Sequence, residues 1–432
     1  MHLAPRAYLL IVLTAVLAIA GIWSEDAGLA QLWRLPALLL LVGISIESRV
    51  VRRAVVQTDI ETMGTAVLGR PQQAAFVFRN VAGPRVEVEY APAAPAGYEP
   101  LRRVRRIVVP AGDFQRDAVS LLPVRLGPQV WPELPARLLG PLRLVWWART
   151  LHPDKRLAIA PDVLRRLRPR ARDISTGMRP RRVTGAGSEL HQLRSYVHGD
   201  PPARIDWKAT ARARQLVTRE FSEDQHLDIL IAIDAGRLSR VRAGALDRFG
   251  LYANIAARFA EAATPRDDRV GLIVFAERTL ALCPPERGLR AVMRLRQALE
   301  QLQVEPAESD PVGAAIRIRR ALRHRGLVVF LTDLEDASVA DALVRAVRLL
   351  APPHLVVVAG VHGHELEELA RRPAASWLDP WVALAARERE ARAAAQQQLL
   401  RRLGAPVIVA REGLLEEAVL SEYERLRRSR SV

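Results

Sequence analysis

The feature that most constrains the fold is a series of wholly apolar runs in the second half of the chain, each followed by a helical pattern. In the run Ile229–Ile233 no polar residue alternates with the apolar ones, so both faces of such a strand must be buried. Buried strands that alternate with helices are typical of a parallel sheet covered on both sides. The sequence therefore predicts a doubly wound α/β domain over 227–432. Its strands are expected at 227–234, 269–277, 326–333, 354–360 and 406–410, and its helices at 247–263, 286–302, 312–323, 338–350, 364–371, 380–403 and 413–428.

Residues 55–160 show a different pattern, in which short apolar runs are separated by proline and glycine. Runs of this kind with turn residues between them are typical of short paired strands. We therefore expect a small β-sandwich-like domain over 55–160. Its clearest strands are predicted at 74–78, 86–90, 106–109 and 118–124.

Two apolar runs near the N-terminus predict a transmembrane helical hairpin over 1–53. The first, Tyr8–Trp23, carries no charge and would be about 24 Å long as a helix. The second, Leu35–Ile46, is extended by the apolar residues in 27–33. Arg34 alone lies on the loop side, so the positive-inside rule predicts that the soluble domains face the cytoplasm. The basic residues outside the two runs are Arg6, Arg49, Arg52 and Arg53.

A cleaved signal peptide is the alternative for the first apolar run. Ala18-Ile19-Ala20 has the small-residue spacing of a cleavage motif. The second apolar run, with basic residues directly behind it, favours the hairpin.

An arginine-rich linker is predicted at 161–190. Residues 165–182 contain eight arginines against one acidic residue, Asp173, and so concentrate much of the formal net charge of +17. Two interpretations stay open: the linker binds an anionic lipid headgroup or an acidic partner, or it is a solvated connector. It lacks the interleaved aromatic residues on which single-stranded bases stack, so we expect no nucleic-acid partner.

Two aspartates end predicted strands of the α/β domain. Asp234 and Asp333 would lie at the carboxyl edge of the sheet, where ligands of such folds bind. The loop before the helix at 312–323 could add Ser309 or Asp310, and Thr332 and Glu335 lie beside Asp333. Carboxylate and hydroxyl oxygens suit a hard cation such as magnesium. The alternative is that Asp234 anchors a loop by accepting hydrogen bonds from backbone N–H groups.

This layout resembles the von Willebrand factor type A domain and its metal-ion-dependent adhesion site. The family pattern is Asp-x-Ser-x-Ser after the first strand, a later threonine and a later aspartate. Here Gly236 and Leu238 stand where the two serines occur, and Ser239 is one residue out of register. The resemblance implies a degenerate magnesium site whose candidate ligands are Asp234, Ser239, Ser309 and Asp333.

The segment 191–226 is the most specific part of the sequence. Its core reads RSYVHGDPPARIDWKATARARQLVTREF over 194–221. Gly199–Pro202 predicts a turn, and Asp206 is placed to cap a helix over 207–214. Residues 215–221 read as a strand that could pair beside 228–233.

This segment resembles the signature of a bacterial family known as domain of unknown function fifty-eight. The resemblance implies a membrane-tethered partner of a MoxR-type AAA+ ATPase, acting in chaperone-like assembly or maturation of a client protein. The matching residues are Tyr196, Gly199, Asp200, Arg204, Ile205, Asp206, Trp207, Lys208, Ala211, Arg212, Arg219, Glu220 and Phe221.

Two interpretations of the signature stay open. Its charged residues and Trp207 could form a docking surface for the partner. Alternatively, a buried Trp207 among paired charges could staple the segment to the α/β domain. The second interpretation is the one favoured from sequence.

Enzyme motifs are missing from the sequence. There is no GxxxxGK[ST] loop and no GxSxG elbow, and the run from His362 to Glu368 lacks the second histidine of HExxH. The single cysteine, Cys283, has no histidine beside it in sequence. We therefore expect a non-catalytic interaction protein. The alternatives are a metal-assisted hydrolase that uses Asp234 and Asp333, and an anionic-lipid-binding module built on the arginine linker.

Overall fold

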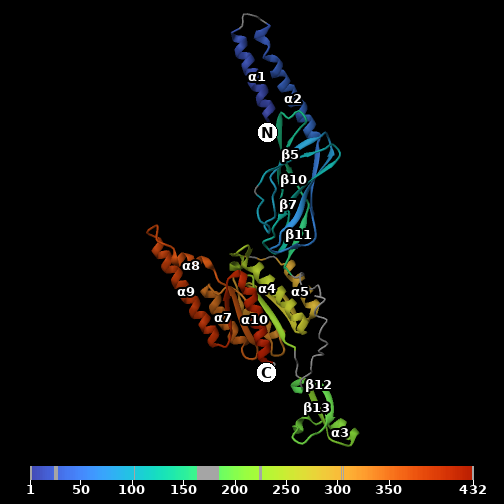
Figure 1. Ribbon diagram of the computed structural model, residues 1–432, viewed down its shortest axis with the longest axis vertical. Helices are drawn as coiled ribbons and strands as arrows, with labels where there is room; N and C mark the ends of the chain where they lie inside the picture. Colours follow the sequence, from blue (N-terminus) through green and yellow to red (C-terminus); the bar gives the residue numbers. More distant parts are fainter. Residues whose placement is uncertain are drawn as a thin grey trace. The chain divides into compact units, whose positions relative to one another are not determined.

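A computed structural model describes residues 2–23, 28–101, 103–162, 184–222, 226–302, 304 and 306–430 (Figure 1). The chain divides into two compact units. The first contains 1–162, 242–250 and 297–304, and the second contains 163–241, 251–296 and 305–432. The segments 242–250 and 297–304, which the sequence assigned to the α/β domain, therefore group with the first unit. The arginines at 165–182 lie outside the described residues.

The first unit begins with two helices that pack side by side, α1 (Pro5–Ile22) and α2 (Arg34–Arg53), joined through the short helix η1 (Leu29–Gln31). Pro5 occupies the first turn of α1, where its missing N–H costs no hydrogen bond. Among the described helices, α1 is the one that is long and apolar enough to cross a membrane. α2 carries Glu47 and several arginines within its length, so the second span stays a prediction.

The rest of the first unit contains three small sheets and the two-stranded hairpin of β15 (Arg242–Ala243) and β16 (Leu246–Asp247). The first has the order β1 (His2–Leu3), β10 (Val145–Leu151), β9 (Leu134–Leu139), β5 (Val86–Tyr90) and β6 (Arg105–Val109). The second has the order β2 (Val55–Thr62), β4 (Gln72–Ala82) and β7 (Phe114–Leu121). The third has the order β3 (Ala66–Val67), β11 (Arg156–Ala160) and β8 (Gly127–Val130). The Tyr90 ring on β5 packs against Phe76 and Phe78 on β4, with centroids 5.5 and 4.7 Å apart. This shared core confirms the predicted β-sandwich-like domain.

The second unit holds a six-stranded sheet. Its order is β18 (Thr279–Arg287), β17 (Arg269–Phe275), β14 (Asp228–Asp234), β19 (Leu327–Leu331), β20 (Leu355–Val361) and β21 (Val407–Ala410). All neighbouring pairs from β17 to β21 are parallel. This arrangement confirms the predicted doubly wound α/β fold.

Helices cover both faces of this sheet. Alternate residues of the strands, such as Leu230 and Ala232, share a core with α6 (Pro311–Ala321), α7 (Ala337–Leu350) and α9 (Asp379–Arg402). The residues between them on β14 are also buried. α4 (Arg248–Ala263) and α10 (Glu412–Arg430) pack together, with the rings of Phe259 and Tyr423 4.7 Å apart. The remaining helices are α5 (Gly288–Glu300) and α8 (His364–Arg371).

The antiparallel edge strand β18 was not predicted. It pairs with β17 and contains Pro284 and Pro285, residues that argue against a strand in the middle of a sheet. At an edge one side of the strand has no neighbour, so missing N–H groups are tolerated there.

The predicted pairing of residues 215–221 beside 228–233 is wrong. β13 (Val217–Ser222) pairs antiparallel with β12 (Thr184–Ser195) in a separate two-stranded hairpin. β14 has β17 on one side and β19 on the other, so neither of its edges is open to a third strand. β12 also begins inside the stretch predicted as a linker.

Candidate functional site

The predicted site at the carboxyl edge of the α/β sheet is centred on Asp234, the last residue of β14. Its Oδ2 accepts hydrogen bonds from Ser309 Oγ at 2.9 Å and from Thr332 Oγ1 at 2.6 Å. Its Oδ1 accepts one from the backbone N–H of Gly236 at 2.8 Å. Ile233 on β14 pairs with Leu331 on β19, so the next residue along β19, Thr332, is brought to the end of β14.

Asp333 lies at the same end of the sheet, in the loop that follows β19. Its Oδ1 accepts a hydrogen bond from the N–H of Glu335 at 2.8 Å, which holds the loop after β19 in a tight turn. The side chain of Asp234 is almost fully buried, and this burial raises its pKa. The nearby carboxylate of Asp333 acts in the same direction, while the three hydrogen bonds to Asp234 oppose the rise.

The structure brings together three of the four predicted metal ligands. Asp234 and Ser309 are bonded directly, and Asp333 adjoins them. Ser239 is buried, and its hydroxyl has no hydrogen-bond partner among the described residues. From the sequence, Thr332 was noted only as a neighbour of Asp333, and its hydrogen bond to Asp234 was not predicted.

The oxygens present do not make a full magnesium set. A Cβ at Gly236 would lie 3.1 Å from Asp234 Oδ1 and 3.1 Å from Ser309 Cβ, so a serine there would reach the carboxylate, but glycine supplies no hydroxyl. Ser309 and Thr332 donate to Asp234. Within the part of the chain that the structure describes, no group of three or more His, Cys, Asp or Glu residues could hold a metal ion.

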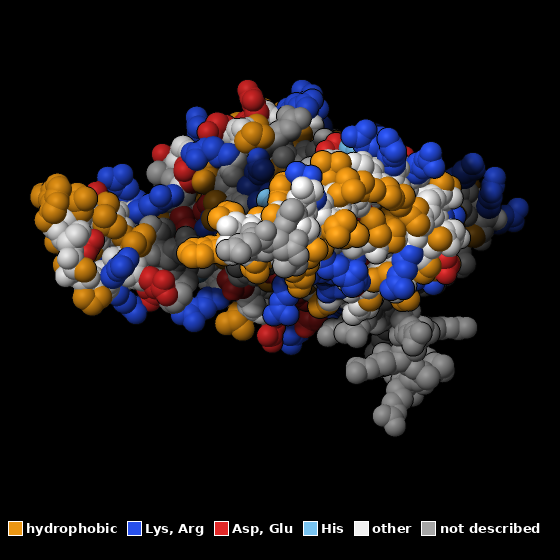
Figure 2. All heavy atoms as spheres, turned by 90° about the horizontal axis from the view of Figure 1, so that it is seen from above, with side chains coloured by type: hydrophobic (Ala, Val, Ile, Leu, Met, Phe, Trp, Pro, Cys, Tyr) orange, Lys and Arg blue, Asp and Glu red, His pale blue; other side chains and the backbone are white. Residues whose placement is uncertain are grey.

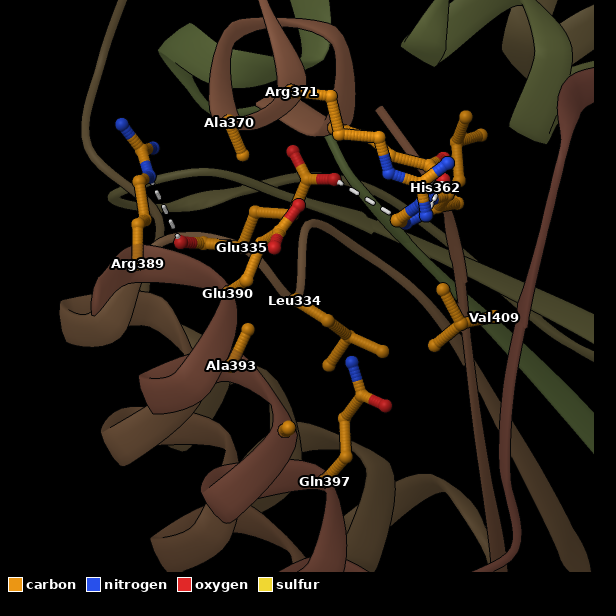
Figure 3. Close-up of a pocket in the computed structure, with 13 residues that line it drawn as sticks. Leu334, Glu335, His362, Ala370, Arg371, Arg389, Glu390, Ala393, Gln397 and Val409 are labelled. Atoms are coloured by element: carbon orange, nitrogen blue, oxygen red, sulfur yellow. Dashed lines mark hydrogen bonds and ion pairs between the residues drawn. The ribbon is translucent and has the colours of Figure 1, made fainter. Parts of the chain in front are cut away.

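A pocket of about 370 Å³ lies beyond the loop that follows Asp333, and no sequence pattern pointed to it (Figure 3). It is lined by residues that follow β19, by residues at the end of β20, by Val409 of β21 and by residues of α8 and α9. Its polar groups already contact one another. Glu335 accepts a hydrogen bond from Gly363 N–H at 2.6 Å, Arg389 Nε donates to the Glu335 carbonyl at 3.3 Å, and His362 lies 3.7 Å from Glu367.

The signature segment forms the hairpin of β12 and β13 with the short helix α3 (Trp207–Ala213). The guanidinium of Arg194 forms two hydrogen bonds of 2.8 Å with Asp200. Gly199 has a φ of +107°, a conformation that side chains disfavour. The hydrogen bonds from Arg194 hold the pKa of Asp200 below its usual value. This pair and the glycine fix the predicted turn.

Asp206 caps α3, as predicted. Its carboxylate accepts a hydrogen bond from Ala209 N–H at 3.0 Å and pairs with Arg219 at 3.1 Å. The Ala209 bond is the main reason why the pKa of Asp206 lies below its usual value. The predicted ionic network is therefore confirmed for Asp200 and Asp206. Arg204 also makes an interaction within the structure, whereas the side chains of Glu220 and Phe221 lie outside the described residues.

The prediction of a buried Trp207 is wrong. Its side chain is 64% exposed, and no residue of α3 is buried. Lys208 and Arg212 are exposed as well, and their charged groups have no ion-pair partner in the described ranges. In the hairpin the buried side chains are instead those of Val217 and Thr218 on β13. The signature thus has a structural part, around Asp200 and Asp206, and an exposed part, which contains Trp207, Lys208 and Arg212.

Comparisons with known proteins agree with the resemblance. A family model described as "Protein of unknown function DUF58" matches residues 192–380. Uncharacterized proteins of Mycobacterium bovis and Mycobacterium tuberculosis are 24% identical over 153 residues, which is 35% of this chain and 48% of theirs. This chain therefore spans about half the length of the curated relatives it matches.

Solved structures with similar parts include the conserved hypothetical protein BatB from Bacteroides thetaiotaomicron. It is 15% identical, covers 47% of this chain and 99% of its own, and has a TM-score of 0.32. An aerotolerance-related membrane protein from Bacteroides fragilis is 14% identical, covers 41% and 98%, and has a TM-score of 0.26. The SpRpn10 VWA domain is 12% identical, covers 46% and 95%, and has a TM-score of 0.29.

With TM-scores of this size, the fold assignment rests on the strand order of the sheet itself. The family model covers both the signature hairpin and most of the sheet. Residues 192–380 of this chain thus match the DUF58 family model, and the α/β domain that they largely cover has a doubly wound, von Willebrand factor A-like fold.

Proposed function

We propose that this chain is a membrane-anchored, non-catalytic interaction protein that docks a MoxR-type AAA+ ATPase through the exposed part of its signature hairpin. The family resemblance supplies the class of partner. The observation that carries the proposal is the 64% exposure of Trp207 beside Lys208 and Arg212, two cations that form no ion pair with any residue that the structure describes.

The composition of this surface is that of a binding site. Tryptophan and arginine are the residues that most often dominate binding energy at interfaces. Val197 and Leu216 of the same hairpin are also exposed, so apolar area surrounds the cations. Apolar side chains that cluster on a surface are unfavourable in water, and the free energy of the system falls when a partner covers them. The cations favour a partner that presents acidic groups around an apolar cleft.

The N-terminal helices support membrane anchorage. α1 has the length and hydropathy of a span, and leucines of α2 such as Leu38 and Leu41 are exposed. The arginines at the end of α2 favour a cytoplasmic location for both units. An ATPase of the cytoplasm could then reach the hairpin.

The geometry around Asp234 supports a structural role for this carboxylate. Both of its oxygens accept hydrogen bonds, and the side chain is 5% exposed. A general base must present a free oxygen to its substrate. Asp234 instead ties together β14, the loop at Ser309 and the end of β19.

A capture experiment tests the docking surface. The full chain is immobilised in mild detergent. Purified MoxR-type ATPase is then added with nucleotide, and the amount of ATPase that stays bound to the chain is measured. The double variant Trp207→Ala/Arg212→Glu should reduce capture at least about tenfold, since each anchor is of the kind that supplies 2 kcal/mol or more. The matched control is Trp381→Ala/Arg317→Glu, which removes a tryptophan of similar exposure, 66%, and an exposed arginine elsewhere.

Equal capture by both double variants would overturn the docking surface, and no capture by the unaltered chain would overturn the choice of partner. Phosphoester turnover that Asp333→Ala abolishes would instead establish the metal-assisted hydrolase.

A further inference from the structure

An apolar groove of about 510 Å³ opens between α1, α2 and the turn that joins β9 to β10. This volume lies in the range of small-molecule sites, about 300–1,000 Å³. Its walls are the side chains of leucines and other aliphatic residues, among them Leu9, Leu39, Val42 and Leu142. Figure 2 looks down on the α1–α2 pair and shows hydrophobic side chains gathered over it.

Arg6 is the one charged residue of the groove. Its Nη1 lies 3.5 Å from the carbonyl oxygen of Leu142, which holds the guanidinium over the β9–β10 turn. Among the described residues it has no carboxylate partner. A cation without a counterion at one end of a hydrocarbon surface fits a ligand with an anionic head and an apolar tail.

The groove is held in shape by the packing of the turn against α2. Leu144 Cδ1 lies 2.6 Å from the place where a Cβ of residue 43 would stand, so any larger residue at this position would have to displace the end of the Leu144 side chain. Glu47 Oε2 accepts hydrogen bonds from the N–H groups of Leu144 and Val145 at 2.9 and 3.1 Å. These contacts fix two walls of the groove relative to each other.

We propose that this groove binds one anionic phospholipid, with the phosphate on Arg6 and an acyl chain along Leu9, Leu39 and Val42. The exposed arginines at the end of α2 (Arg49, Arg52 and Arg53) enrich anionic lipids at the same end of the helix pair. The ligand is a phospholipid rather than a free phosphate because nearly all of the lining is apolar. The site rests on the membrane anchorage proposed above.

The test is native mass spectrometry of the full chain, purified from membranes in mild detergent and supplied with dioleoyl-phosphatidylglycerol, dioleoyl-phosphatidylcholine or inorganic phosphate. We expect one phosphatidylglycerol to be retained in preference to phosphatidylcholine, and no phosphate. Arg6→Gln should weaken this retention about tenfold, the loss of one charge-assisted hydrogen bond. Leu39→Trp, which fills the groove from the helix surface, should abolish it.

Two matched controls separate this site from general lipid contact. Arg34→Gln removes a cation at the other end of α2, and Leu41→Trp enlarges an equally exposed leucine outside the groove. Neither should change retention. Equal retention by Arg6→Gln and Arg34→Gln, or a phosphatidylglycerol stoichiometry that Leu39→Trp leaves unchanged, overturns the lipid site. Release of the unaltered chain from membranes by alkaline carbonate overturns the anchorage itself.

Discussion

The Asp234 cluster and the signature hairpin use charged residues in opposite ways. At the end of β14 the carboxylate is buried, and each of its oxygens accepts a hydrogen bond from the chain itself. On α3 the cations of Lys208 and Arg212 and the ring of Trp207 face solvent. The first arrangement stabilises the fold, while the second leaves its side chains accessible to the proposed partner. Burial and pairing therefore separate residues that hold the fold from residues that stay accessible, where residue type alone does not.

Removal of the Asp234 carboxylate is the substitution from which we expect the largest effect, and it tests the structural role of this residue. Asp234→Ala leaves the hydroxyls of Ser309 and Thr332 without their acceptor. We expect the free energy of unfolding of the α/β domain to fall by about 3 kcal/mol, as for other buried groups left unsatisfied. Urea denaturation of the detergent-solubilised chain, followed by circular dichroism, measures this loss. Asp234→Asn keeps one acceptor oxygen and should lose less. An unchanged urea midpoint for Asp234→Ala would show that the cluster does not hold the strands together.

Restoring the missing hydroxyls tests the magnesium interpretation. Gly236→Ser/Leu238→Ser rebuilds the serine pattern of the adhesion site, and titration calorimetry with MgCl₂ measures binding. We expect magnesium affinity to rise at least about tenfold, or 1.4 kcal/mol. Gly236→Ala is the matched control, because it adds the same Cβ beside Ser309 without an oxygen. If the magnesium affinity of Gly236→Ala rose equally, the added Cβ and not the hydroxyl would be the cause, and the serines would not be acting as ligands.

The two regions should also respond to pH with opposite sign. The folded-state pKa of Asp234 is raised, so its contribution to stability is present below the unfolded pKa and is lost as pH rises through the folded value. The pKa values of Asp200 and Asp206 are lowered, so their contribution is present above the unfolded pKa and is lost as pH falls.

Thermal unfolding across the acidic range measures these slopes. Asp234→Asn should remove the loss of stability on raising pH, and Asp206→Asn should reduce the loss on lowering it. Slopes of the same sign for both aspartates would contradict the contrast between the regions.

The smallest expected effect on stability is at Trp207. Its side chain packs against little, so Trp207→Ala should change the free energy of unfolding by less than about 0.5 kcal/mol, as for other surface substitutions. The urea midpoint of the full chain checks this. A loss of 2 kcal/mol would restore the staple interpretation. An unchanged midpoint together with lost ATPase capture separates docking from folding.

The sequence predicted what local patterns determine. Wholly apolar runs predicted five of the six strands of the sheet, and the capping role of Asp206 followed from its place before a helix. Thr332 was missed as a donor because it lies 98 residues from Asp234 in sequence, and only the pairing of β14 with β19 brings the two together. β13 could not pair with β14 because β17 and β19 occupy both sides of that strand. The spacing of apolar residues along the sequence does not reveal this order of strands. The exposure of Trp207 depends on tertiary packing, which the signature motif does not encode.

The bonds of Glu47 have a mechanical consequence. One carboxylate oxygen in α2 holds two successive N–H groups of the sandwich, so turning the helix about its axis by one residue, about 100°, would carry that oxygen away from both. Rotation of α2 is thus coupled to movement of the sheet edge. A force applied to the sandwich is transmitted through these two hydrogen bonds to α2, both along the helix axis and as a rotation about it.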